Sequence, residues 1–405
     1  MGDKKQRKRS FQQQIFNALD SRFKAGQGRS KHQDKQNKSN LNHDIIYMSD
    51  EHKNIKDTMK DVGRFIKEKH PEYWREQLDK IPVQVFDEYL KTKTDCSQNT
   101  INSYKSRIEK AFRCAAATYK TGNFEHTQYI NTPLSDRSEE ATLRDIAIGR
   151  DVLELALKYM QKGSGGYIGN KIASMFGPRV FEIAKIQVRD VDFNTNTLVI
   201  KKGKGGKRRE IKMTDKQAAV MAEFCKNKKP SVPICGCGVD AIQRGLSRAL
   251  ERIDKEFGTD LANQLADKKT NTHAIRKLIA TEQFYANLNK EKFKYIKSIV
   301  EKDLEYVRKN GMTNEMLNKY GGDLSKLDPK NIDYFCKKYF NALDKKLIDP
   351  VTLRKLEHDA WGPVSEMLGH GYGRWELKEI YVISDKTKII SLPADVKEAI
   401  KAKFA

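Results

Sequence analysis

Apolar residues recur three to four positions apart along most of the chain, which is the period of an amphipathic helix. Residues 44–119 contain three such segments. The last of them begins at Ser97 or Asn99, residue types that favour the N-cap of a helix. The same period returns at 143–160 and 172–186, and it holds over most of the C-terminal half. The pattern predicts a mainly α-helical protein.

One stretch departs from the helical period. The segments 197–202 and 207–213 flank a glycine-rich turn at 203–206, which is typical of a β-hairpin. The predicted fold class is therefore mainly α with a small antiparallel β-sheet. It would consist of a helical domain followed by an α+β domain.

Polar stretches divide the chain into parts. The first 43 residues contain few large apolar groups and an excess of Lys and Arg, so we expect a basic flexible arm there, with a short helix around residues 11–23. The expected parts after it are a helical domain (44–119), an irregular linker (120–138) and a larger domain (139–405) with a helical insertion at about 286–360 and a C-terminal tail at 382–405.

Composition narrows the class of function. Over 405 residues, 77 Lys and Arg outnumber 54 Asp and Glu, so the net charge is +23. Such an excess points to a polyanionic partner, most often nucleic acid. No run of eighteen apolar residues exists, and no apolar segment follows the basic N-terminus. These features exclude a membrane-spanning helix and a secretory signal, so we expect a cytoplasmic, nucleoid-associated protein.

The six cysteines are scattered, and the one close pair, Cys235 and Cys237, lacks the spacing of a zinc site. We therefore expect reduced thiols, no metal and no cofactor.

Four separated segments each contain one or two Arg, Lys, His or Tyr residues, whose side chains can act on a phosphodiester. They are Arg179 after a Gly-Pro turn, Lys204 at the tip of the predicted hairpin, His273 with Arg276, and Leu368-Gly369-His370 followed by Tyr381. A spacing of three places His273 and Arg276 on one face of a helix. Each segment is a weak signal by itself.

In this order, the segments resemble the motifs of the tyrosine recombinases, the phage integrase family of site-specific DNA recombinases. Their counterparts are the first arginine box (Arg179-x-x-Glu182), the hairpin with the catalytic lysine (Gly203-Lys204-Gly205), the His-x-x-Arg box (Thr272-His273-x-x-Arg276), and the second histidine with the nucleophile (Leu368-Gly369-His370 and Tyr381). The resemblance covers roughly 139–385, and residues 44–119 are similar to the family's SAM-like core-binding domain.

The resemblance implies a catalytic set that suits the chemistry. Arg179 and Arg276 would clamp the non-bridging phosphate oxygens, because two guanidiniums bind them bidentately and stay charged. His273 and His370 would donate hydrogen bonds or handle the proton of the tyrosine. Lys204 would protonate the leaving 5′ oxygen, and Tyr381 would form a covalent 3′-phosphotyrosine. Tyr372 is the rival nucleophile, and we prefer Tyr381, the last tyrosine of the chain.

Other basic side chains crowd one helix and the hairpin, where they would contact the DNA backbone. They are Lys105, Arg107, Lys110, Arg113, Lys201, Lys202, Lys207, Arg208 and Arg209.

The resemblance implies a prokaryotic or phage-encoded recombinase or integrase of a mobile genetic element. It would act as a homotetramer on two double-stranded sites through a four-way junction, with the C-terminal tail exchanged between protomers. Directionality or DNA-bending factors would be further partners. A telomere resolvase, a type IB topoisomerase and a non-catalytic DNA-binding protein on the same fold remain open. The 91 residues between Arg276 and Leu368, more than the family usually has there, keep the telomere resolvase open.

Overall fold

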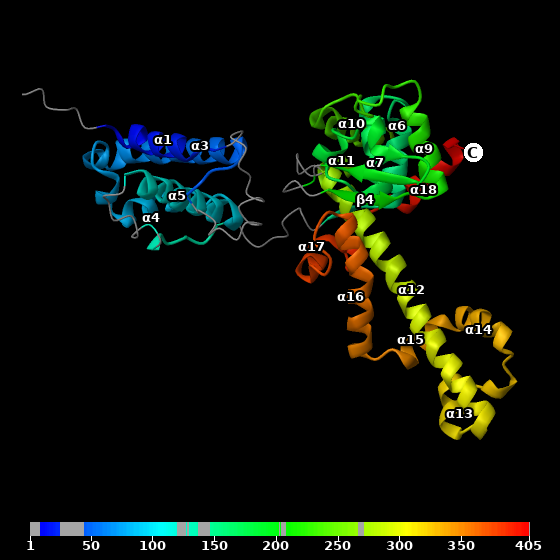
Figure 1. The fold of residues 1–405 in the computed structure, drawn as a ribbon. Coiled ribbons are helices and arrows are strands. Elements are labelled where there is room, and N and C mark those ends of the chain that lie inside the picture. Colours follow the sequence, from blue (N-terminus) through cyan, green and yellow to red (C-terminus); the bar gives the residue numbers. More distant parts are fainter. Residues whose placement is uncertain are drawn as a thin grey trace, which may run out of the picture. The chain divides into compact units, whose positions relative to one another are not determined.

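The computed structural model describes residues 9–24, 44–119, 127, 129–136, 146–201, 203, 208–265 and 271–404. It divides into two compact units, Met1–Glu140 and Ala141–Ala405 (Figure 1). We refer to them as the N-terminal and C-terminal units. Among the described residues, no helix has the combination of length and hydropathy that a bilayer span requires.

The described part of the N-terminal unit is helical, as predicted for residues 44–119. Its α-helices are α1 (Phe11–Arg22), α3 (Ser49–Lys69), α4 (Val83–Lys91) and α5 (Gln98–Tyr119), with short 3-10 helices at Pro71–Tyr73 and Leu78–Lys80. Their apolar faces share one core, in which the rings of Phe86 and Phe112 lie edge to face, 5.0 Å apart. The described residues of the predicted linker, 127 and 129–136, lie against this unit, where Ser135 donates its N–H to Gln98.

Helix α1 corrects the prediction of a flexible arm over residues 1–43. Phe11, Ile15 and Leu19 are fully buried, and α1 packs on α3 and α5. Ser10 and Gln13 close a capping box at its start. The short helix expected around residues 11–23 is present, but it belongs to the core, because a spacing of four aligns these apolar side chains on one face. The rest of the predicted arm lies mostly outside the described residues.

The C-terminal unit is mainly helical around a small sheet. Before the long helix α12 (Asn271–Asn310) its elements are β1 (Ala147–Ile148), α6 (Arg150–Tyr159), α7 (Gly165–Phe176), α8 (Val180–Ile183), a 3-10 helix (Val188–Asp190), β2 (Val191–Asp192), β3 (Thr197–Ile200), β4 (Arg209–Lys212), α9 (Asp215–Cys225), α10 (Val239–Phe257) and α11 (Leu261–Leu265). Strands β2, β3 and β4 form an antiparallel sheet, so the predicted small antiparallel sheet is confirmed. Ile200 pairs with Arg209 at the loop end of the hairpin.

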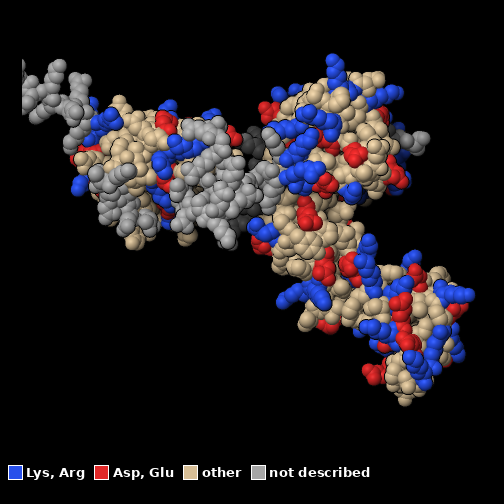
Figure 2. All heavy atoms as spheres, viewed as in Figure 1, with Lys and Arg blue, Asp and Glu red and all other residues tan. Residues whose placement is uncertain are grey.

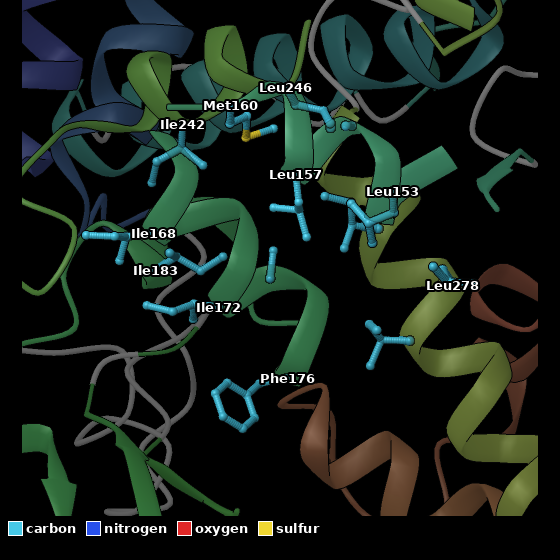
Figure 3. Close-up of a cluster of buried hydrophobic side chains, with 14 of the residues drawn as sticks. Leu153, Leu157, Met160, Ile168, Ile172, Phe176, Ile183, Ile242, Leu246 and Leu278 are labelled. Atoms are coloured by element: carbon cyan, nitrogen blue, oxygen red, sulfur yellow. The ribbon is translucent and has the colours of Figure 1, made fainter. Parts of the chain in front are cut away.

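The main core of this unit lies between α6, α7, α10 and the start of α12. Leu157 of α6, Ile172 of α7 and Leu246 of α10 are among the side chains that meet there (Figure 3). Helices α7 and α10 approach closely at two glycines, since a Cβ on Gly245 would lie 3.2 Å from the Cα of Gly166. This core fixes the end of α7 relative to the start of α12.

Helix α12 (Asn271–Asn310) is 40 residues long and would span about 60 Å. Its first part packs in the main core, and its middle part packs on α16 (Pro350–Met367) around Trp361. Its far part carries a separate core with α13 (Asn314–Tyr320), α14 (Ile332–Lys338) and α15 (Phe340–Leu347), which Figure 1 shows gathered near the far end of α12. Two 3-10 helices, Leu324–Lys326 and Pro329–Asn331, lie between α13 and α14. The stretch expected to be a helical insertion is thus helical.

After α16 the chain forms a 3-10 helix (Trp375–Leu377), α17 (Lys378–Tyr381), a 3-10 helix (Lys386–Lys388), β5 (Ile389–Ile390) and α18 (Ala394–Phe404). Strand β5 pairs in parallel with β1, and Leu392 and Val396 enter the main core. Lys397 and Asp151 form an ion pair of 2.9 Å. In this single chain the tail folds on its own unit. Its exchange between protomers stays a prediction.

Candidate active site

Five of the six predicted catalytic side chains come together in the C-terminal unit. Arg179 precedes α8, His273 and Arg276 lie in the first turns of α12, His370 follows α16, and Tyr381 ends α17. The sixth, Lys204, lies outside the described residues, as do Lys202 and Lys207, which we expected to bind DNA.

Arg276 is the most enclosed member of the group. Only 1% of its surface is exposed. Its Nη1 donates to the carbonyl oxygen of Gly177 at 2.6 Å, and its Nη2 donates to the carbonyl oxygen of Leu368. Gly177 has a φ of +62° at the end of α7, a conformation that suits glycine. Burial, followed by the nearby charge of Arg179, lowers the pKa of Arg276 to about 10, so the guanidinium remains charged at neutral pH.

Arg179 shares a partner with Arg276. Its Nη1 lies 3.3 Å from the carbonyl oxygen of Leu368, which therefore accepts from both guanidiniums. Its Nη2 lies 3.4 Å from Nε2 of His370. The turn after α16 thus holds two arginines side by side and places a histidine against one of them. Two adjacent guanidiniums suit the binding of one phosphate group.

Tyr381 lies against Arg276 of this pair. Tyr381 is 7% exposed, and its ring centroid lies 5.2 Å from the guanidinium carbon of Arg276. The rings of His273 and His370 have their centroids 5.6 and 5.2 Å from that of Tyr381. The buried hydroxyl of Thr281 on α12 anchors the backbone here, because it accepts the N–H of Ile383 at 3.0 Å.

The rival tyrosine has a different environment. Tyr372 is 59% exposed, and its ring lies over Gly362 of α16, where a Cβ would approach it to 2.4 Å. The ring contacts with Arg276, His273 and His370 described above belong to Tyr381. Of the two candidates, Tyr381 is therefore the tyrosine that the structure places with them.

Glu182 holds Arg179 in place through hydrogen bonds. Its side chain is fully buried, and it accepts from the backbone N–H of Arg179 at 2.9 Å and from two nitrogens of Arg209 at 3.1 and 2.6 Å. Burial raises the pKa of this carboxyl, but the hydrogen bonds and charges of Arg209 and Arg179 outweigh burial and lower it overall. Glu182 is therefore a buried anion between two arginines.

Arg209, which we predicted to contact the DNA backbone, points into the protein. Its side chain is only 9% exposed, and its guanidinium points inward to Glu182 and to the carbonyl oxygen of Met367. Strand alternation explains this placement, because Arg209 shares a face with buried Ile211. Arg208, by contrast, is exposed and pairs with Glu210 at 2.7 Å.

The other predicted DNA contacts are partly engaged within the protein. On α5, Arg107 donates to Thr58 and Lys110 donates to the carbonyl oxygen of Ile45. Together with Arg113 these two side chains line a cavity of about 430 Å³. Lys105 and Arg113 each lie within 4 Å of Glu109. In the C-terminal unit, Lys201 pairs with Asp190 at 2.5 Å.

Sequence reasoning missed a row of arginines on α10. We call Arg244, Arg248 and Arg252 the α10 arginine row. All three are exposed and line a cavity of about 410 Å³ between α6, α7 and α10. Arg244 and Arg252 donate to the carbonyl oxygens of Asp240 and Tyr159, and among the described residues no carboxylate pairs with the row. Figure 2 shows Lys and Arg gathered over the side of the unit where α10 lies. The spacing of four was a signal, since it aligns the three on one helical face.

The chain forms a helical unit followed by a mainly helical unit with a small antiparallel sheet, as the resemblance to the tyrosine recombinases implied. Residues 150–293 match the phage integrase family, and residues 30–129 match the phage integrase SAM-like domain. Together the two matches span more than half of the chain, which belongs to the phage integrase family. DNA binding and DNA recombination are therefore its general activity. The first match ends at 293, within the stretch expected to be an insertion.

No curated protein sequence matches the chain. Among solved structures, the chain is similar to the Tn1549 transposon integrase (residues 82–397) in complex with circular intermediate DNA. The identity is 14%, the TM-score is 0.44, and 97% of this chain and 99% of that chain are covered. It is also similar to the XerA recombinase, at 10% identity and a TM-score of 0.29, with 97% and 98% covered.

Proposed function

We propose that the chain is a site-specific recombinase, the integrase of a mobile genetic element, and that it cuts and rejoins double-stranded DNA through Tyr381. The observation that carries this proposal is the shared Leu368 carbonyl, which holds Arg179 and Arg276 side by side, with the ring of Tyr381 against Arg276. Two adjacent fixed cations, one of them in contact with a tyrosine, suit attack on a phosphodiester, where negative charge grows on the non-bridging oxygens.

In the first step the Oη of Tyr381 attacks phosphorus and loses its proton to a histidine, His273 or His370. The bond from phosphorus to the 5′ oxygen breaks, and Lys204 supplies the proton that this oxygen needs. The products are a 3′-phosphotyrosine and a free 5′-hydroxyl. Attack by the 5′-hydroxyl of another strand reverses the chemistry and frees the tyrosine, so the covalent bond conserves the energy of the phosphodiester.

The arginines are fixed before the DNA binds. Arg276 uses both terminal nitrogens on the carbonyls of Gly177 and Leu368, so little reorganisation accompanies the reaction. Its pKa, lowered to about 10, still leaves it charged at pH 7. Electrostatic stabilisation by donors fixed in this way is often the largest single contribution to catalysis.

Backbone affinity would come from basic side chains outside the active site. We assign this role to the predicted contacts other than Arg209 and add the α10 arginine row. The predicted contacts are Lys105, Arg107, Lys110, Arg113, Lys201, Lys202, Lys207 and Arg208. The working assembly would be a tetramer on two DNA sites that passes through a four-way junction, with the tail from β5 to α18 exchanged between protomers and directionality or DNA-bending factors as further partners.

A nicked suicide substrate tests the proposal, because the short fragment released by cleavage diffuses away and the covalent complex accumulates. The substrate carries DNA from the sequences that flank the coding region. We expect a covalent protein–DNA complex with the wild type and with Tyr372→Phe, and none with Tyr381→Phe. The absence of a complex with the wild type, or its persistence in Tyr381→Phe, would contradict the proposal.

A further inference from the structure

Arg209 is a buried cation at the start of β4. Its side chain is 9% exposed, and three of its nitrogens have partners. Nη1 and Nη2 lie 3.1 and 2.6 Å from the two oxygens of Glu182, and Nε donates to the carbonyl oxygen of Met367 at 2.9 Å. This is a bidentate ion pair with an additional hydrogen bond, a geometry that fixes the planar guanidinium in place.

Both partners of Arg209 are linked to candidate active-site residues. Glu182 accepts the backbone N–H of Arg179 at 2.9 Å and lies 3.3 Å from its Nη1. Met367 ends α16 and precedes Leu368, whose carbonyl oxygen accepts from Arg179 and Arg276. One guanidinium therefore joins the segment that carries Arg179 to the turn that holds both arginines.

The turn is shaped around Arg209. Gly369 has a φ of +75°, and a Cβ at this position would lie 2.7 Å from Nη1 and 3.0 Å from Cζ of Arg209. Any side chain at 369 would push the guanidinium away from Glu182. His370 follows directly and lies 3.4 Å from Arg179, so the position of Arg209 and that of the histidine are coupled through one residue.

We propose that Arg209 is a positioning residue for the two arginines that clamp the phosphate. It acts through Glu182 on Arg179, and through Met367 on the turn that holds Arg179, Arg276 and His370. Arg209 itself touches no DNA. The inference rests on the proposed function, since it needs a cleavage reaction to act on. A misplacement of about 1 Å in a catalytic group can cost about 10²-fold in rate, so the loss of Arg209 should slow cleavage while DNA affinity is kept.

Three substrates separate this role from its alternatives. The first is the ordinary suicide substrate. The second carries a methylphosphonate at the cut position, which removes the negative charge that the clamp stabilises. The third carries a 5′-thiolate leaving group, which needs no protonation. The variants are Arg209→Met and Arg209→Lys. The matched control is Arg189→Met, since Arg189 is exposed in the same unit and its guanidinium donates to Gln187.

We expect Arg209→Met to slow covalent-complex formation on the ordinary substrate at least about tenfold, with unchanged DNA affinity. The loss should shrink on the methylphosphonate and persist on the thiolate. Arg209→Lys should lie between the wild type and Arg209→Met, because an ammonium keeps the charge but not the bidentate geometry. Arg189→Met should match the wild type. If Arg209→Met does not fold, Arg209→Lys carries the same comparison.

Three results would overturn the inference. An equal loss on the phosphate and the methylphosphonate would mean a general structural defect. Rescue by the thiolate would mean that Arg209 acts on the leaving group, through Lys204 five residues before it in the chain. An unchanged rate would mean that Arg209 positions nothing. A wild type that forms no complex with any of the substrates would instead contradict the proposed function.

Discussion

Replacing Glu182 with Gln preserves the shape of the side chain and removes the buried negative charge between Arg179 and Arg209. The carboxylate is fully buried and bonded to both arginines. Removing one partner of a buried ion pair costs about 3–5 kcal/mol, because the other charge stays buried without compensation. For a unit of this size each kcal/mol shifts the melting temperature by about 2–4 °C, so we expect a decrease of about 6–20 °C at pH 7.

The stability lost in Glu182→Gln depends on pH. Burial raises the pKa of Glu182, but Arg209 and Arg179 lower it below its ordinary value of 4.5. The folded pKa is then lower than the unfolded pKa, so the stabilisation is complete above about pH 4.5 and is lost as the pH falls through the folded value. The difference between wild type and Glu182→Gln should therefore be largest near neutral pH and shrink in acid.

Differential scanning calorimetry of the full-length protein measures both effects. Glu210→Gln is the matched control, because Glu210 lies in the same unit, on β4 next to Arg209, is half-exposed and pairs with Arg208. An exposed pair contributes at most about 1 kcal/mol. A Glu182→Gln transition close to that of Glu210→Gln at pH 7, or a difference that grows in acid, would refute the reasoning.

Three further predictions address other parts of the chain. Lys204→Ala should slow cleavage of an ordinary suicide substrate by about 10²-fold or more and spare one with a 5′-thiolate; equal slowing of both removes Lys204 from the acid role. Phe11→Ala should lower the free energy of unfolding of the N-terminal unit by about 3–5 kcal/mol, measured in urea. The exposed-site control Asn17→Ala should change it little. Similar values for both variants would mean that α1 does not contribute to the core. Changing the α10 arginine row to Gln should reduce the salt slope of DNA binding by about 2.7, measured by fluorescence anisotropy over a range of salt; an unchanged slope means that the row contacts no phosphate.

The grouping of the candidate catalytic residues could be predicted because it depends on spacing and order. His273 and Arg276 are three residues apart, and the structure places both beside Tyr381. The Leu368 carbonyl shared by Arg179 and Arg276 could not be predicted, since it joins residues that are 92 or more positions apart. Contacts of this kind depend on how α7, α12 and α16 pack.

Arg209 and helix α1 lie deeper in the protein than local composition indicates. Arg209 is surrounded by basic residues in the sequence, which favours a surface position, but strand alternation places it on the same face as buried Ile211. Helix α1 lies among Lys and Gln residues in the sequence, which favours an exposed segment, but Phe11, Ile15 and Leu19 have the spacing of a buried helical face. In both cases the period of the element carried information that local composition obscured.

The central claim is that Tyr381 forms the covalent bond to DNA. The direct measurement is to digest the covalent complex with protease and nuclease and to identify the modified peptide by mass spectrometry. We predict a nucleotide remnant on Tyr381, attached through a 3′-phosphate, and an unmodified Tyr372. A remnant on Tyr372, on another residue, or attached through a 5′-phosphate would contradict the account.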